Sequence, residues 1–168
     1  TFAQMLADEL GADFDRIVVH HGDTSNTPQG NGTMGSRGLA VGGAAVMASA
    51  VKIRDKMLAI AGHQLEVAKD DVEYDRETGT YRVKGSPDRS LTFNEIAEVA
   101  YGGGLPDDID AGLVTTDFFK TTGETYPFGT HVAMVEIDPE TGKVEVKNFW
   151  SVDDCGNVIS PILVEGQV

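Results

Sequence analysis

The chain has 168 residues, and its 40% apolar content suits a folded protein with a buried core and argues against general disorder. Its 27 acidic and 13 basic residues give a formal net charge of −14, so nucleic acid is a poor general partner. Cys155 is the single cysteine, which excludes an internal disulfide framework and predicts a reducing, cytoplasmic location. A membrane span needs about 18 consecutive apolar residues, and the apolar runs of this chain are much shorter, so we expect no membrane-spanning segment.

Helical periodicity begins at the first residues, where Phe2, Met5, Leu6 and Leu10 share one face and Gly11 predicts the end of the helix. This start has no signal-peptide pattern. A short strand is then predicted within residues 14–24, "FDRIVVHHGDT". A long helix follows from about residue 39 to 65, with apolar side chains mostly at three- and four-residue steps.

Strands become more frequent in the second half of the chain. Residues 71–85 alternate as a hairpin with its turn at residues 77–79, and residues 90–101 predict a helix capped by Ser90 or Thr92. Three strands are predicted within residues 112–119 and 126–156, the last two joined by the turn at residues 138–143. Pro161 suits the first turn of a final helix. Helices mixed with mainly antiparallel strands, without a βαβ rhythm, predict an α+β fold.

The glycine-rich stretch "GDTSNTPQGNGTMGSRGLAVGGAAV", residues 22–46, is either a turn-rich connector or a bed for a ligand. Its "GNGTMGS" matches G-x-G-x-x-G, but the second strand and acidic residue of a dinucleotide fingerprint are missing, as is a Gly-Lys-Ser/Thr phosphate loop. Residues 35–38 nevertheless lie where the long helix begins, so their amides and the helix dipole could face an anion. The alternative is that Ser36 caps the helix and Arg37 is simply solvated.

The segment "SVDDCGNVISPILVEGQV" holds the second candidate site. Adjacent acids point to opposite faces of a strand, so Asp153 and Asp154 make a weak metal site. Cys155 has no neighbouring cation to activate its thiol. Each histidine lacks a partner at metal-binding spacing, and we assign no metal ligand and no catalytic residue. Both ends of the chain interrupt a predicted element, so we expect residues 1–168 to be one fragment of a domain, cut at both ends.

These segments, with the intervening "AGHQLEVAKDDVEYDRETGTYRVKG" and "TYPFGTHVAMVEIDPETGKVEVKNFW", resemble the molybdopterin-binding large subunit of the xanthine dehydrogenase family, in its branch of aerobic carbon monoxide dehydrogenase large chains and aldehyde dehydrogenases. The resemblance covers essentially the whole chain. Ser160 departs from it, because the family usually has Asn before this proline.

The resemblance implies an α+β molybdenum cofactor-binding domain that holds molybdopterin, usually as its cytosine dinucleotide in bacteria. Thr33, Met34, Gly35, Ser36 and Arg37 would follow the phosphate and pterin region, and Asp154, Cys155 and Gln167 would line the cofactor from the other side. The intact enzyme would oxidise carbon monoxide, an aldehyde or a heterocycle with oxygen from water, and pass electrons to an iron–sulfur small subunit and an FAD-binding medium subunit.

The family's Gly-Gln-Gly motif, its substrate loop and its catalytic glutamate have no counterpart in these residues, so we expect the fragment alone to be inactive. The alternative function is a non-enzymatic, degenerate assembly module of such a complex, which Ser160 permits. Apolar area that normally packs against other parts of the subunit predicts self-association of the isolated fragment. The substrate is left open by this sequence.

Overall fold

The computed structural model describes residues 1–27, 29–30 and 32–168, and the chain divides into two compact units, residues 1–122 and residues 123–168. The described residues of the first unit form three α-helices and a three-stranded sheet, and those of the second form a two-stranded hairpin and a short helix. Each unit is an antiparallel sheet combined with helices, which confirms the predicted α+β class.

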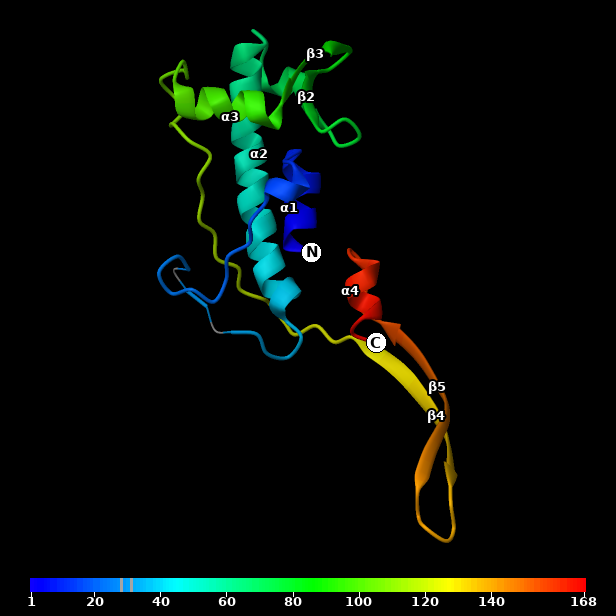
Figure 1. Cartoon of the computed structure of the whole chain (residues 1–168). Coiled ribbons are helices and arrows are strands. Elements are labelled where there is room, and N and C mark those ends of the chain that lie inside the picture. Colours follow the sequence, from blue (N-terminus) through cyan, green and yellow to red (C-terminus); the bar gives the residue numbers. More distant parts are fainter. Residues whose placement is uncertain (28, 31) are drawn as a thin grey trace. The chain divides into compact units, whose positions relative to one another are not determined.

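The helices of the first unit begin and end where local sequence signals place them (Figure 1). Helix α1 spans Phe2–Leu10 and ends at Gly11, whose φ of 73° is left-handed. A π-helical turn η2, Gly38–Gly43, leads into α2, Ala44–Gln64. Helix α3 spans Phe93–Gly102, and a capping box joins Thr92 and Glu95 at its start. Of the two predicted caps, Thr92 is the one used.

The first sheet has the order β1-β2-β3 and is antiparallel throughout. Strands β1 (Val72–Asp75) and β2 (Thr80–Val83) form the predicted hairpin, and Asp75 accepts hydrogen bonds from the backbone of Glu77 and the hydroxyl of Thr78 in its turn. Strand β3, Ser86–Thr92, was not predicted, because its proline and polar residues lack a strand pattern. Pairing with β2 forms it. The short 3₁₀ turn η3, Lys69–Asp71, precedes β1.

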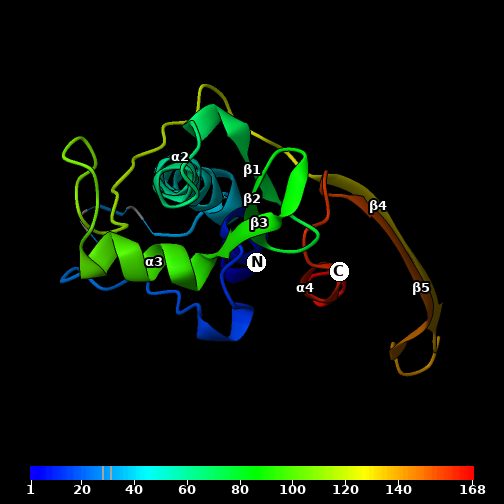
Figure 2. The same ribbon diagram turned by 90° about the horizontal axis from the view of Figure 1, so that it is seen from above.

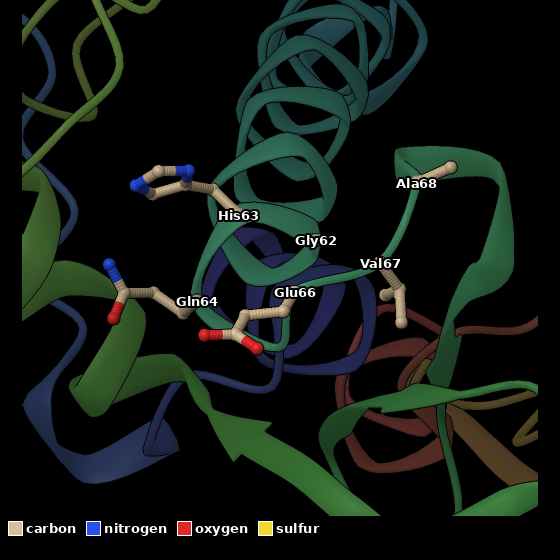
Figure 3. A pocket seen from close by; sticks show the side chains of 6 residues that line it. All are labelled: Gly62, His63, Gln64, Glu66, Val67 and Ala68. Carbon is tan, nitrogen blue, oxygen red and sulfur yellow. The ribbon is translucent and has the colours of Figure 1, made fainter.

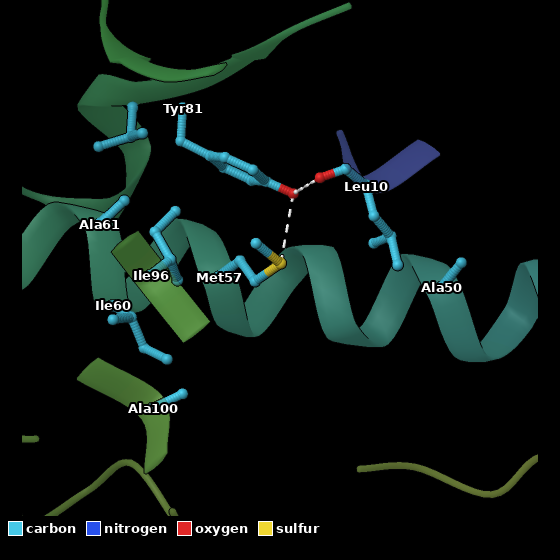
Figure 4. Packing of buried hydrophobic residues seen from close by; sticks show 9 residues of the cluster. Leu10, Ala50, Met57, Ile60, Ala61, Tyr81, Ile96 and Ala100 are labelled. Carbon is cyan, nitrogen blue, oxygen red and sulfur yellow. Dashed lines mark hydrogen bonds between the residues drawn. The ribbon is translucent and has the colours of Figure 1, made fainter. Parts of the chain in front are cut away.

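Helix α2 carries most of the first unit's core, with α1, α3 and the sheet packed around it (Figures 1 and 2). Tyr81 of β2 is the largest fully buried side chain, and its hydroxyl donates to the Leu10 carbonyl at 3.1 Å and lies 3.4 Å from the Met57 sulfur (Figure 4). Burial raises the pKa of the Tyr81 hydroxyl, so it remains a neutral donor. The buried cluster consists of Leu10, Ala50, Met57, Ile60, Ala61, Val72, Tyr81, Ile96 and Ala100.

One buried carboxylate joins α1 to α2 and to the β1–β2 turn. Glu9 is 3% exposed, and its two oxygens pair with Arg54 of α2 and, at 2.6 Å, with Arg76 of the turn. Three segments distant in sequence therefore meet at one charged group, which is held by charge-assisted hydrogen bonds.

The glycine pair at the start of the long helix serves helix packing. A Cβ on Gly42 would lie 3.5 Å from the Phe2 ring, and a Cβ on Gly43 would lie 2.8 Å from Leu39 and 3.4 Å from Met5. Helix α1 therefore packs against Gly42 and Gly43 at a distance that leaves room for about one methyl group, and the tight contact of an added Cβ is with Leu39 of η2 itself. These glycines belong to the fold, whereas the glycines at 32 and 35 lie in open space.

Two of the predicted strands are wrong. Residues 14–24 contain the 3₁₀ turn η1, Phe14–Arg16, followed by irregular backbone in which Val18 is exposed, and residues 112–119 are irregular as well. Both have the apolar pattern of a strand but no partner strand among the described residues, so no ladder forms. Within the second segment, Asp117 instead accepts hydrogen bonds from Ser49, at 2.9 Å, and from Lys52 of α2.

The second unit is built on a long antiparallel ribbon (Figure 1), formed by β4 (Phe128–Ile137) and β5 (Val144–Asp154). Asp138 holds the predicted turn by accepting the N–H groups of Glu140 and Thr141, and those bonds keep its pKa below its usual value. Helix α4, Pro161–Glu165, starts with the predicted proline. Both faces of the ribbon are largely exposed, including Phe149 and Trp150.

None of the helices formed by the described residues combines the length and the apolarity needed to cross a bilayer.

Candidate functional site

The loop that precedes the long helix has two successive parts. In the first part, the Asp23 carboxylate accepts from the Ser25 N–H at 2.9 Å and from the Asn26 side chain at 3.1 Å, and the Ser25 bonds hold the Asp23 pKa below its usual value. The Thr27 N–H donates to the Asp23 carbonyl at 2.8 Å. Asp23 thus organises a turn before the predicted cofactor residues.

In the second part, three residues have left-handed backbone, two of them adjacent. Gly32 has φ 74°, Gly35 has φ 58° and Ser36 has φ 55°. Left-handed backbone is uncommon for a residue with a side chain, and such outliers gather at binding sites. The Arg37 N–H closes the turn on the Met34 carbonyl at 3.3 Å, and Arg37 precedes the first residue of η2.

The five predicted residues of this loop, Thr33 to Arg37, are all exposed. Among the described residues, none accepts a hydrogen bond from the N–H of Met34, Gly35 or Ser36. A Cβ on Gly32 or Gly35 would meet no atom within 4 Å. Backbone donors, one guanidinium and the start of a long helix therefore share one accessible segment, which suits an anionic group. Ser36 is not the helix cap. The N-cap residue of η2 is Arg37, and no side chain makes a capping hydrogen bond there.

The predicted residues of the second unit begin at Asp154, the last residue of β5. The Asp154 carboxylate accepts from the Gly156 N–H at 2.8 Å, which turns the chain immediately after the strand, and Cys155 is exposed with a free thiol. Gln167 follows α4, where its N–H donates to the Val164 carbonyl at 2.9 Å. A carboxylate repels phosphate but accepts bonds from ring N–H groups, so Asp154 suits a heterocycle.

The predicted site residues are divided between the two units. Thr33 to Arg37 are contiguous within the first unit, and Asp154 and Cys155 are contiguous within the second, with Gln167 after its final helix. The first unit thus presents backbone amides and a guanidinium at an accessible loop, and the second presents a carboxylate and a thiol at the end of a strand.

A pocket lies at the other end of α2 from the glycine-rich loop. It is lined by Gly62, His63, Gln64, Glu66, Val67 and Ala68, and the His63, Gln64 and Glu66 side chains spread outward around it (Figure 3). Its lining includes no predicted site residue. Searching the described residues finds no group of three or more His, Cys, Asp or Glu side chains arranged to hold a metal ion.

Sequence reasoning missed a side-chain cluster directly before Asp154. His131 of β4 bonds to Asp153 of β5 at 3.1 Å, and Ser151 donates to the same carboxylate. The sequence pattern suggests for His131 only the role of a metal ligand, for which it lacks a partner at the right spacing. Asp153 is adjacent in sequence to the predicted site residue Asp154, which could have drawn attention to it. Its pairing with His131, however, depends on the register of the two strands.

The chain belongs to the molybdopterin cofactor-binding domain family, because residues 1–168 match the model of that domain. More particularly, the chain is 39% identical over 168 residues to the carbon monoxide dehydrogenase large chain of Afipia carboxidovorans. It is 35% identical over 170 residues to the nicotine 6-hydroxylase large subunit of Paenarthrobacter nicotinovorans. Each alignment covers 100% of this chain, but only 20% and 21% of the respective relatives.

Solved structures give the same assignment. A Cu,Mo-CO dehydrogenase in its carbon monoxide reduced state matches with a TM-score of 0.91 and 39% identity, covering 99% of this chain and 21% of that one. Quinoline 2-oxidoreductase from Pseudomonas putida 86 matches with a TM-score of 0.86 and 35% identity, again covering 99% and 21%. The resemblance predicted from the sequence is thereby confirmed, and this chain spans about one fifth of those relatives.

Proposed function

We propose that residues 1–168 are one fragment of a molybdenum cofactor-binding domain, within the large subunit of a molybdenum hydroxylase. The observation that carries the proposal is the agreement over the whole chain with a Cu,Mo-CO dehydrogenase, at 39% identity and a TM-score of 0.91. The left-handed, exposed loop at the start of η2 and α2 supplies the physical support, because it offers backbone donors to an anion.

Each predicted cluster has its own role in the proposal. Thr33, Met34, Gly35 and Ser36 bind the phosphate and pterin region through backbone N–H groups, and Arg37 adds a positive charge. Asp154 accepts from ring N–H groups, and Cys155 and Gln167 line the ring system beside it. The cofactor is proposed to be molybdopterin cytosine dinucleotide, whose phosphates suit the amide-rich loop.

When bound, the cofactor supplies the molybdenum redox chemistry that inserts oxygen from water into the substrate. The residues of this chain bind and orient it, and none of them is assigned as a proton donor or acceptor in the reaction. The 168-residue chain alone is therefore expected to be inactive. Turnover of an aldehyde by the purified chain with an artificial electron acceptor would contradict this expectation.

The parent enzyme is proposed to oxidise carbon monoxide, an aldehyde or a heterocycle, which are the substrate classes of its family. The matched relatives carry the names carbon monoxide dehydrogenase, nicotine 6-hydroxylase and quinoline 2-oxidoreductase, which span gaseous and heterocyclic substrates. An iron–sulfur small subunit and an FAD-binding medium subunit are the proposed partners. The proposed location is cytoplasmic, which suits the free thiol of Cys155.

The first test is the composition of the full-length parent, purified with its partner subunits. We expect molybdenum by elemental analysis and released cytosine nucleotide by chromatography, each near one per large chain. Absence of both from a folded, matured preparation would overturn the proposal and favour the degenerate assembly module.

Two matched glycine variants then test the loop. Gly35→Ala and Gly85→Ala each place a side chain at a left-handed φ, 58° and 77°, with no atom within 4 Å of the new Cβ. The backbone cost is therefore alike, about 1 kcal/mol or more. Only Gly35→Ala is expected to lower the molybdenum and nucleotide content, and equal contents in the two variants would contradict the role of the loop.

A further inference from the structure

The end of β5 is held by side chains that converge on Asp153. His131 of β4 donates from its Nε2 atom to Asp153 Oδ1 at 3.1 Å, and the Ser151 hydroxyl donates to Oδ2. These two bonds, that of Ser151 first, keep the Asp153 pKa below its usual value, so the carboxylate stays ionised and accepts from both. The His131 ring also packs edge-on against Phe149, with centroids 5.7 Å apart.

A glycine beneath the carboxylate makes this arrangement possible. Gly129 lies opposite Asp153 in the ladder. A Cβ on Gly129 would overlap Asp153 Oδ1 and would lie 2.8 Å from the Val152 carbonyl oxygen. The carboxylate therefore folds across the β4 backbone on its way to His131, and only glycine leaves the space.

An irregularity in the ribbon brings these residues to one face. Near the turn, Ile137 pairs with Val144 and Val135 pairs with Val146. A bulge follows, and beyond it Met134 pairs with Asn148. The extra residue, Lys147, shifts the register by one, so His131 lies opposite Ser151. Without that shift His131 would lie opposite Trp150, and Asp153 would point to the other face.

We propose that Gly129, His131, Ser151 and Asp153 form a positioning unit that holds the end of β5, so that Asp154 and Cys155 are presented to the cofactor in a fixed geometry. Asp153 is the residue directly before this pair, and Asp154 bonds to Gly156 to begin the following turn. Side chains at i and i+1 of a strand point to opposite faces, so anchoring Asp153 on one face directs Asp154 to the other. This inference rests on the proposed function.

The test uses the full-length parent with its partner subunits. His131→Ala removes the bond to Asp153, whereas His131→Gln retains a side-chain N–H donor. Glu136→Gln is the matched control, because it removes an exposed ion pair, Glu136 to Lys147 at 2.7 Å, from the same hairpin. The measurements are molybdenum and cytosine nucleotide per large chain. In the cofactor-free protein, the alkylation rate of Cys155 by iodoacetamide is followed by peptide mass spectrometry.

We expect the affinity of His131→Ala for the cofactor to fall about 3- to 10-fold, the range that corresponds to one lost hydrogen bond, so that the purified variant retains less molybdenum and nucleotide than the wild type. Its Cys155 should also be alkylated faster. His131→Gln should recover most of both properties, and Glu136→Gln should match the wild type. Rescue by the glutamine is the result that a general loss of hairpin stability would not produce.

Two results would overturn the inference, and they differ from failure of the proposed function. The inference alone is overturned if the wild type contains the cofactor and His131→Ala keeps the same molybdenum and nucleotide content and the same rate of Cys155 alkylation. Equal losses in His131→Ala, His131→Gln and Glu136→Gln also overturn it. A folded wild-type parent without molybdenum or nucleotide overturns the proposed function, and the inference with it.

Discussion

Removing one of the two arginines that pair with Glu9 should destabilise the first unit strongly. Glu9 is 3% exposed, whereas Arg54 and Arg76 are 27% and 55% exposed at their side chains. Arg54→Met retains the aliphatic stem and leaves the buried carboxylate with Arg76 alone. Breaking a buried pair costs about 3–5 kcal/mol, and a hydrogen bond to a charged group contributes about 1.5–3 kcal/mol. Because Arg76 remains, we expect a loss of about 2 kcal/mol.

Urea unfolding of the 168-residue chain, followed by helical circular dichroism, measures this loss, since α1, α2 and α3 all belong to the first unit. With a urea slope of about 1–3 kcal/mol per molar, a loss of about 2 kcal/mol lowers the midpoint by about 1 M. The matched control is Lys69→Met, which removes the exposed ion pair to Asp55, with side chains 40% and 65% exposed.

The control should cost less than about 1 kcal/mol, because water already solvates both of its charges. Equal midpoint shifts for Arg54→Met and Lys69→Met would refute the reasoning, since burial of Glu9 would then carry no special cost. Arg54→Met and Arg76→Met together should cost more than the sum of the single losses, because the carboxylate would be buried without a partner.

Three further predictions concern local bonds, pH and association. Thr92→Ala removes the capping box of α3 and should cost about 1 kcal/mol, measured as a urea midpoint, whereas Ser90→Ala should leave it nearly unchanged. Hydrogen bonds from Lys52 and then Ser49 hold the pKa of the Asp117 carboxyl below its usual value. A carboxyl whose pKa is lower in the folded state stabilises the protein at pH values above its unfolded-state pKa. That stabilisation is lost as the pH falls through its folded-state pKa. The free energy of unfolding should therefore decline below about pH 4 in the wild type and decline less steeply in Asp117→Asn. Thermal melts recorded across that pH range measure the difference. Finally, the exposed apolar side chains of β4 and β5, including Trp150, predict self-association of the isolated chain, and a monomeric mass by light scattering at high concentration would contradict it.

Local signals in the sequence account for the features predicted correctly. Gly11 ends α1 because glycine readily adopts the left-handed backbone found after the last turn of this helix, and Thr92 with Glu95 starts α3 through bonds within four residues. The turns at residues 77–79 and 138–143 depend in the same way on Asp75 and Asp138, whose carboxylates accept nearby backbone N–H groups. The glycine-rich loop was also recognisable, since left-handed backbone at Gly32 and Gly35 needs that residue type.

The strand predictions that were wrong concern segments whose structure depends on partners far away in the chain. Residues 14–24 and 112–119 have strand-like composition, but a strand also requires a second strand to receive its hydrogen bonds, and the described residues provide none. Strand β3 shows the converse, because a polar segment with a proline becomes a strand once β2 is beside it.

The family, the α+β class, the ends of the helices and the position of the candidate loop are all predictable from residue order, because each depends on residue types in a short window or on a resemblance along the whole chain. Which charged groups meet depends instead on tertiary packing. Burial of Glu9 between two arginines requires three separate segments to pack. The contact of His131 with Asp153 requires one extra residue in β5, because a single-residue shift of register moves a side chain to the opposite face of the ribbon.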